Sequence, residues 1–220
     1  MMQIRTFQGG YDNNLSYLIW CDQTRVAALI DASVEVHPIW DVILEEELLL
    51  DKILITHSHR DHISYLNDIL DFKPLAKLYG FHDLANQFNN EQFHGVHDYD
   101  VISVGKHLLT VLHTPGHLSD CLCFWHQNLN MIFTGDTMFV GRTGRTIGPD
   151  SNIFHLYNSV YKKLLTLKPA TIVYPGHHYG FQKSISIGEN IRLSNFFSCN
   201  SFEEFKIVME KFEHGRGKKE

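Results

Sequence analysis

The sequence predicts an α/β fold in a single domain that spans residues 1–220. Short apolar runs typical of buried strands alternate with segments whose apolar residues recur at helical spacing, and they do so in both halves of the chain. No internal repeat, low-complexity block or linker divides the sequence. A hydrophobic content of 44% is enough for a sizeable buried core.

The first half is expected to form strands with short helices between them. Strands are expected over residues 2–7, 15–20, 26–30, 52–55 and 77–80. Helices are expected over residues 38–48, from 62 onward and over 83–88. Pro38 is interpreted as a first helical residue, because its fixed φ suits that position. His94 and His97 are assigned to a surface loop, since they lack the spacing of metal ligands.

The second half continues the alternation. Strands are expected over residues 101–104, 107–112, 121–125, 130–134 and 170–174, the first two forming a hairpin that turns at Gly105. A helix is expected from about Asn152. Ser201–Glu204 is a capping box that begins a last helix, with its apolar side chains facing inward. Residues 215–220 are expected to form a frayed tail.

Composition excludes several classes of function. The net charge of −6 argues against a nucleic-acid partner, which needs a basic face. No signal peptide is visible, and no apolar run approaches the length of a membrane span. The four cysteines show no disulfide or zinc-finger spacing, and Cys121 and Cys123 are expected to pack in the core. A cytoplasmic protein is therefore expected.

The stretch from His57 to His62 contains three histidines and one aspartate. It follows an apolar run that reads as a buried strand opening into a functional loop. His57 and His59 point the same way on an extended backbone, and Asp61 and His62 then turn aside. One loop can thus offer ligands to two adjacent metal positions, for which zinc, iron and manganese are suitable. The alternative is a cluster of solvated histidines, and the metal hypothesis requires further ligands elsewhere.

Three other expected strand ends carry residues of ligand type. His117, Asp136 and His177 each follow a glycine, which fits a tight turn or a close backbone approach. Strand ends at one edge of packed sheets converge on a common crevice. Asp31 also ends a strand, and it could either orient a ligand histidine or cap a turn.

These motifs, taken in order, resemble those of the metallo-β-lactamase superfamily. The likeness covers nearly the whole chain, through Asp31, the histidine array, Thr114–His117, Thr134–Asp136 and Pro175–His177. The resemblance implies a four-layered αβ/βα sandwich that binds two zinc ions, with iron or manganese as alternatives. It implies one metal on His57, His59 and His117, a second on Asp61, His62 and His177, and a bridging Asp136.

Within the superfamily, Tyr11–Tyr17 and Gly135–Val140 resemble the hydroxyacylglutathione hydrolases, or glyoxalase II. That likeness implies hydrolysis of a thioester such as S-acylglutathione by a metal-bound hydroxide, with Asp61 and Asp136 as catalytic carboxylates. It also implies that Arg145 and Tyr179 contact the substrate.

Some features depart from the glyoxalase II pattern. Ile147 stands where a second glutathione-contacting tyrosine is usual, and the chain is too short for the basic helical C-terminal domain. Both departures leave open whether the thiol part of the substrate is glutathione. Arg60 and Arg142 are interpreted as ordinary surface charges.

A persulfide dioxygenase is the main alternative, since that relative has nearly the same motifs. The resemblance then implies a single iron that is held by ligands on the His59 side of the site together with His117 and Asp136. It also implies glutathione persulfide as the substrate. Ser201–Phe205 resembles that branch, but Gly141–Ile147 lacks its cysteine and its Asp-Phe ending. A non-enzymatic metal-binding protein fits less well, because a closed structural site needs only four ligands. The sequence does not indicate an oligomeric state.

Overall fold

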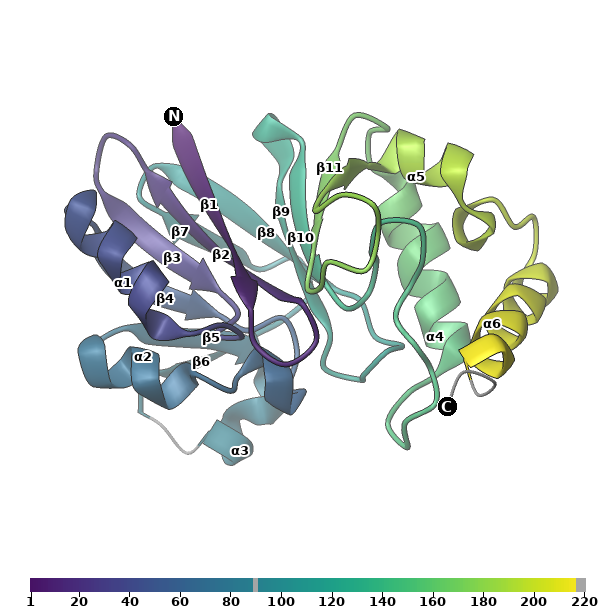
Figure 1. Cartoon of the computed structure of the whole chain (residues 1–220), viewed down its shortest axis with the longest axis horizontal. Helices are drawn as coiled ribbons and strands as arrows, with labels where there is room; N and C mark the ends of the chain where they lie inside the picture. Colours follow the sequence, from purple (N-terminus) through teal and green to yellow (C-terminus); the bar gives the residue numbers. More distant parts are fainter. Residues whose placement is uncertain (89–90, 217–220) are drawn as a thin grey trace.

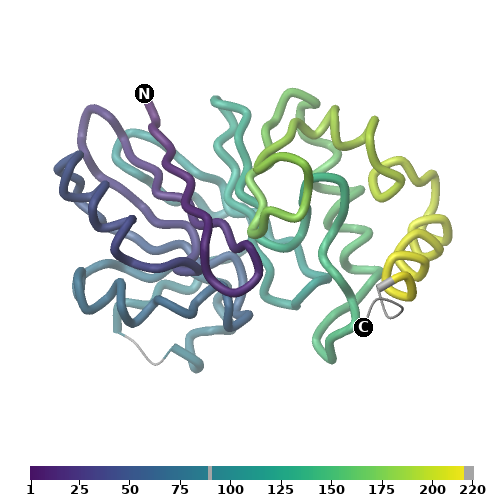
Figure 2. Tube along the Cα trace, viewed as in Figure 1, coloured from purple at the N-terminus to yellow at the C-terminus, as the bar shows by residue number. Residues whose placement is uncertain are grey.

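Two sheets face each other in the computed structural model, which describes residues 1–88 and 91–216 (Figure 1). Within those residues each sheet has six strands. The first sheet has the order β1-β2-β3-β4-β5-β6, and the second has the order β12-β11-β10-β9-β8-β7. The chain completes the first sheet before it begins the second, as the continuous colour change along the trace shows (Figure 2).

The first sheet is antiparallel from β1 to β3 and parallel from β3 to β6. Its strands are β1 (Met2–Gly9), β2 (Asn14–Cys21), β3 (Val26–Ile30), β4 (Leu49–Leu54), β5 (Lys77–Phe81) and β6 (Phe93–Val96). Helices α1 (Val36–Glu45), α2 (Leu66–Phe72) and α3 (Ala85–Phe88) belong to this half. Every residue of β2 is buried, because both faces of the strand are covered.

The second sheet is antiparallel except for the β10–β11 pair. Its strands are β7 (Val101–Val104), β8 (His107–His113), β9 (Leu122–His126), β10 (Met131–Gly135), β11 (Ile172–Pro175) and β12 (Ile185–Ser186). Helices α4 (Ile153–Asn158), α5 (Ile187–Leu193) and α6 (Phe202–Arg216) lie outside it (Figure 1). A wide π-type turn, Ser159–Lys163, and a 3₁₀ turn, Leu164–Thr166, extend α4.

Three apolar cores hold four layers together. Ile39 of α1 packs with Leu18 and Ile53 on the outer face of the first sheet. Tyr17 and Phe133 belong to the core between the sheets. The third core joins the outer face of the second sheet to α4, α5 and α6. The predicted αβ/βα sandwich is therefore confirmed.

Some local expectations were wrong. The helix expected from Pro38 begins at Val36, which leaves the proline in the first turn, where its missing N–H costs nothing. The helix expected from His62 is a 3₁₀ turn, Arg60–His62, followed by α2 from Leu66. His94 lies in β6 and stacks on Tyr79.

Two further elements, β12 and α5, were not predicted, because the segment that forms them is short. The expected frayed tail is wrong at residues 215 and 216, which are helical, and residues 217–220 lie outside the described part. Cys121 and Cys123 are buried, as expected. Among the described residues, no helix combines the length and apolar character that a membrane span requires.

One hydrogen bond between the sheets can be tested. The buried Tyr17 hydroxyl donates to the carbonyl of Pro175 at 2.7 Å. Tyr17→Phe leaves that carbonyl unpaired and should lower the free energy of unfolding by about 1–3 kcal/mol. Urea unfolding measures the change. The matched control variant is Tyr174→Phe, because the hydroxyl of Tyr174 forms no hydrogen bond with the described residues. This substitution should change the free energy of unfolding by no more than about 0.5 kcal/mol. Equal effects would contradict the account.

Candidate metal centre

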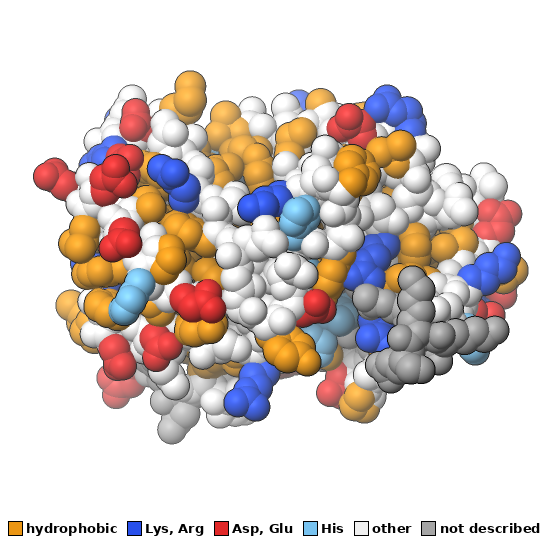
Figure 3. Space-filling model, viewed as in Figure 1, with side chains coloured by type: hydrophobic (Ala, Val, Ile, Leu, Met, Phe, Trp, Pro, Cys, Tyr) orange, Lys and Arg blue, Asp and Glu red, His pale blue; other side chains and the backbone are white. Residues whose placement is uncertain are grey.

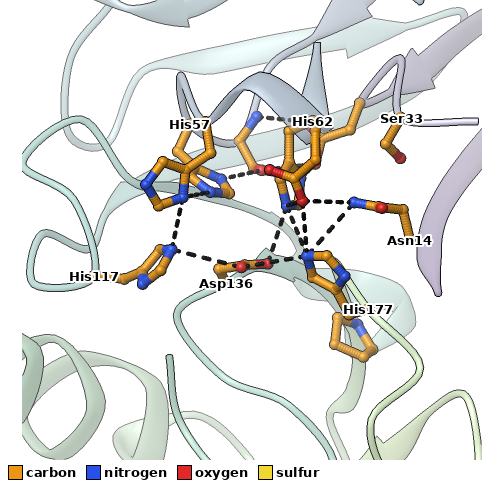
Figure 4. A network of polar contacts seen from close by, with 12 residues as sticks. Asn14, Ser33, His57, His62, His117, Asp136 and His177 are labelled. Carbon is orange, nitrogen blue, oxygen red and sulfur yellow. Dashed lines mark hydrogen bonds and ion pairs between the residues drawn. The ribbon is translucent and has the colours of Figure 1, made fainter. Parts of the chain in front are cut away.

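Four strand ends meet at the edge where the two sheets face each other. The histidine array follows β4, and the other ligand-type residues follow β8, β10 and β11. The structure brings together all seven predicted ligands: His57, His59, Asp61, His62, His117, Asp136 and His177. Figure 4 shows the labelled His57, His62, His117 and His177 pointing toward one another around Asp136.

The first cluster consists of His57, His59 and His117. Nδ1 of His59 lies 3.1 Å from Nε2 of His57 and 2.9 Å from Nε2 of His117. The ligand atoms of all three residues fall within 4.8 Å of one another, so one cation could contact all of them.

The second cluster consists of Asp61, His62 and His177. Nε2 of His62 lies 3.1 Å from Nε2 of His177, and Oδ2 of Asp61 lies 3.3 Å from that same His177 atom. The ligand atoms of these three residues also lie within 4.8 Å of one another. These two clusters share no residue, and a third group, His57, His62 and Asp136, overlaps both of them.

Asp136 lies between the two clusters. Its Oδ2 is 3.5 Å from Nε2 of His117 and 3.4 Å from Nε2 of His177, and its Oδ1 is 3.2 Å from Nε2 of His62. One carboxylate therefore faces both clusters, which is the arrangement that the bridging prediction requires.

The outward nitrogens of His117 and His177 have acceptors that fix the tautomers of these two rings. Nδ1 of His117 is 2.9 Å from the carbonyl of Arg145, and Nδ1 of His177 is 2.8 Å from the carbonyl of Asp12. A carbonyl oxygen only accepts, so each Nδ1 carries a proton, and in the neutral form of each ring Nε2 turns a lone pair inward.

Asp31 fixes two more rings. Its carboxylate accepts from Nδ1 of His62 at 2.8 Å and from the backbone N–H and hydroxyl of Thr56 at 2.8 and 2.7 Å. Because that hydroxyl donates to Asp31, it accepts from Nδ1 of His57 at 3.1 Å. The question left open by the sequence is thus answered for the contacts of Asp31: it orients His62, a predicted ligand, and also holds the neighbouring turn.

The residues present fit a bound cation. Nδ1 of His62 and Nδ1 of His177 both donate outward, so the Nε2 atoms of these neutral rings would face each other at 3.1 Å with repelling lone pairs, and a proton or a metal ion between them relieves that repulsion. Oδ1 of Asp136 is buried without a hydrogen-bond partner among the described residues. A Cβ atom at Gly176 would lie 2.5 Å from that oxygen and 2.6 Å from Cε1 of His62, so only glycine permits this packing. The identity of the ligands remains a prediction.

The electrostatics of the protein alone favour positive charge here. Burial disfavours the charged form of His62, but Asp136 and Asp31 outweigh it and raise the pKa well above its ordinary value. Burial likewise opposes a charged His177, yet Asp136 and Asp61 raise its pKa to about 9. Burial would raise the pKa of Asp136, but His62 and His177 hold it well below its ordinary value. The same carboxylates would stabilise a metal ion.

A pocket of about 170 Å³ opens beside the clusters. Arg145 and Tyr179, the predicted substrate contacts, both line it. The Tyr179 ring stacks on His177, and its hydroxyl donates to Oδ2 of Asp12 at 2.6 Å. On the face seen in Figure 3, histidine and acidic side chains show at the middle, with Lys or Arg side chains beside them.

Three residues of the site escaped the sequence analysis. Arg142, interpreted as a surface charge, lines the pocket, and its guanidinium lies 3.9 Å from the ring centre of Tyr179. Asn14 is buried and donates from Nδ2 to Oδ2 of Asp61 at 2.9 Å. Asp12 accepts from Tyr179. Asp12 and Asn14 belong to a motif that the resemblance had singled out, whereas the surroundings of Arg142 depend on tertiary structure.

Comparison with known proteins agrees with this geometry. Residues 9–177 match the family model described as the metallo-beta-lactamase superfamily. The chain belongs to this superfamily. It is therefore an enzyme of a metal-binding superfamily, and it contains histidine and aspartate clusters that could hold the metal.

The similar proteins include two kinds of enzyme. "Probable hydroxyacylglutathione hydrolase glo2" of Schizosaccharomyces pombe is 33% identical over 177 residues, which cover 77% of this chain and 66% of that protein. The human mitochondrial persulfide dioxygenase ETHE1 is 32% identical over 199 residues, which cover 88% of this chain and 75% of that protein. The crystal structure of ETHE1 from Myxococcus xanthus superposes with a TM-score of 0.84 at 32% identity, covering 96% of this chain and 91% of that one.

The geometry predicts two metal ions per chain. His62→Ala and His177→Ala each remove a ligand from the second cluster and none from the first, so each variant should retain about one equivalent of metal. Elemental analysis of zinc-loaded, desalted protein measures the content. His126→Ala is a matched control, because His126 is buried in β9 outside both clusters, and it should retain two equivalents. Wild-type protein that never exceeds one equivalent would contradict the prediction.

Proposed function

We propose that this enzyme is a binuclear metal-dependent hydrolase that cleaves a thioester, most simply an S-acylglutathione. The observation that carries the proposal is the pair of separate ligand clusters with Asp136 between them. Asp31 and Asn14 hold the second cluster in place. Zinc is the proposed metal, and iron and manganese suit the same donors.

The reaction is a hydrolysis. A water oxygen bonds to the acyl carbon, the carbon–sulfur bond breaks, and the two water protons end on the products, a carboxylic acid and a thiol. Bound cations would lower the pKa of water and stabilise negative charge on the carbonyl oxygen. A thiolate leaves readily, so the protein needs no dedicated general acid.

The two carboxylates have different proposed roles. Asp61 is held by Asn14 and lies against His177, which suits a ligand of fixed orientation. Asp136 faces both clusters, and its Oδ1, which has no hydrogen-bond partner among the described residues, can accept a hydrogen bond from the attacking water. Arg145 and Tyr179 border the adjoining pocket, where the thiol part of the substrate is proposed to bind.

A persulfide dioxygenase is the second candidate. The similarity to both ETHE1 proteins supports it, because it covers more of this chain than the match to glo2 does. His117 and Asp136, with a histidine of the first cluster, would supply the three ligands that mononuclear iron oxygenases use. Such an enzyme consumes molecular oxygen, and the hydrolase does not.

Oxygen dependence separates the two candidates. The zinc-loaded protein should release thiol from S-lactoylglutathione under strict anaerobiosis, because hydrolysis needs no redox change. Thiol release and oxygen uptake are measured on the same preparation, with zinc and with ferrous iron. Oxygen uptake with glutathione persulfide, together with no thioesterase activity in any metal form, would overturn the hydrolase proposal.

Arg145 should affect substrate binding and leave the metal in place. Only its backbone carbonyl contacts His117, so Arg145→Ala keeps that hydrogen bond and removes the guanidinium from the pocket. KM for an S-acylglutathione should rise roughly tenfold or more, the usual effect of losing a charged hydrogen bond. Metal content should stay at the wild-type value, and Arg145→Lys should restore part of the affinity. An unchanged KM would make Arg145 a structural residue.

A further inference from the structure

A second hollow adjoins the metal centre on the side away from Arg145. It has a volume of about 500 Å³ and is lined by Tyr11, Asp12, Arg60, Asp61 and Ser64. Asp12 and Asp61 also line the pocket that contains Arg145 and Tyr179. The two hollows therefore meet at the candidate metal centre, and the second is the larger.

Arg60 is the cation of the second hollow. Its backbone is fixed, because its carbonyl accepts from the Ser64 hydroxyl at 2.8 Å and from the N–H of Ile63 at 3.2 Å. Its side chain is exposed, and its guanidinium forms no hydrogen bond or ion pair with any residue of 1–88 or 91–216. The anchored backbone thus presents a charge that is available to a ligand.

The acidic residues of this hollow already have other partners. Oδ2 of Asp61 accepts from Asn14 at 2.9 Å and lies against His177, on the side of the metal centre. Oδ2 of Asp12 accepts from the Tyr179 hydroxyl at 2.6 Å, on the side of the smaller pocket. Arg60 is consequently the charged hydrogen-bond donor that this hollow can offer to an incoming anion.

The structure of a thioester suggests which part of the substrate each hollow binds. The carbonyl carbon carries two substituents, an acyl chain and a sulfur-linked group, and these diverge from the reacting centre in different directions because the carbon is trigonal. We propose that the acyl chain occupies the second hollow, and that Arg60 selects acyl chains ending in a carboxylate. This inference rests on the proposed thioesterase function. It names the substrate class as thioesters of short dicarboxylic acids.

The test compares acyl groups that differ in charge. Wild-type and Arg60→Ala proteins are assayed with succinyl and butyryl thioesters, each made on glutathione and on N-acetylcysteamine so that the thiol part is varied separately. Wild type should prefer succinyl, and in Arg60→Ala the ratio of kcat/KM for succinyl to butyryl should fall roughly 10- to 100-fold. Arg60→Lys should keep part of the preference. Arg192→Ala, which removes an exposed arginine of α5, should leave the ratio unchanged.

A binding measurement keeps the inference separate from the catalytic proposal. Calorimetry on zinc-loaded protein compares two uncleavable thioethers, S-(3-carboxypropyl)glutathione and S-butylglutathione. Wild type should bind the carboxylated thioether more tightly, and Arg60→Ala should abolish that difference while it keeps the wild-type metal content. Binding of both thioethers with equal affinity, or of neither, would overturn the role of Arg60. Failure to hydrolyse every thioester, with the binding difference intact, would overturn the proposed reaction alone.

Discussion

The site depends on one constraint: the inward nitrogens of the buried His62 and His177 rings face each other, and neither neutral ring can donate to the other. A backbone carbonyl fixes the tautomer of His177, and Asp31 fixes that of His62. The two Nε2 atoms then lie 3.1 Å apart in a buried site, where repulsion between lone pairs is strong. A positive charge between them, a proton or a metal ion, relieves this repulsion. The nearby carboxylates, which raise the pKa of His177 to about 9, supply the compensating negative charge.

The acceptors that impose this constraint come from separate parts of the fold. Asp12 lies in the turn after β1, Asp31 directly follows β3, and Arg145 belongs to the loop after β10. Glu213 of α6 accepts from the N–H of Thr146 at 3.0 Å, so the last helix holds the loop that carries Arg145. The geometry of the centre is thus a property of both sheets and of α6, in agreement with the general importance of groups that orient metal ligands.

The sequence predicted most of the fold because its strands carry strong apolar patterns that end in polar turns. It predicted the candidate ligands because histidine and aspartate recur at those ends. It missed β6, β12 and α5, whose segments are short, so that tertiary contacts decide their structure. It also misread Arg142, because the rings of Phe139 and Tyr179 that flank its guanidinium become neighbours only in the folded chain. Local pattern carries no information about such contacts.

The central claim is that two cations occupy the space between the inward nitrogens, one on each side of Asp136. Anomalous diffraction from crystals of zinc-loaded protein, recorded above and below the zinc absorption edge, tests it most directly. The account predicts two peaks, one among His57, His59 and His117 and the other among Asp61, His62 and His177, each within about 2.0–2.2 Å of its ligand atoms. A single peak at full occupancy, or peaks elsewhere with the rings unchanged, would contradict it.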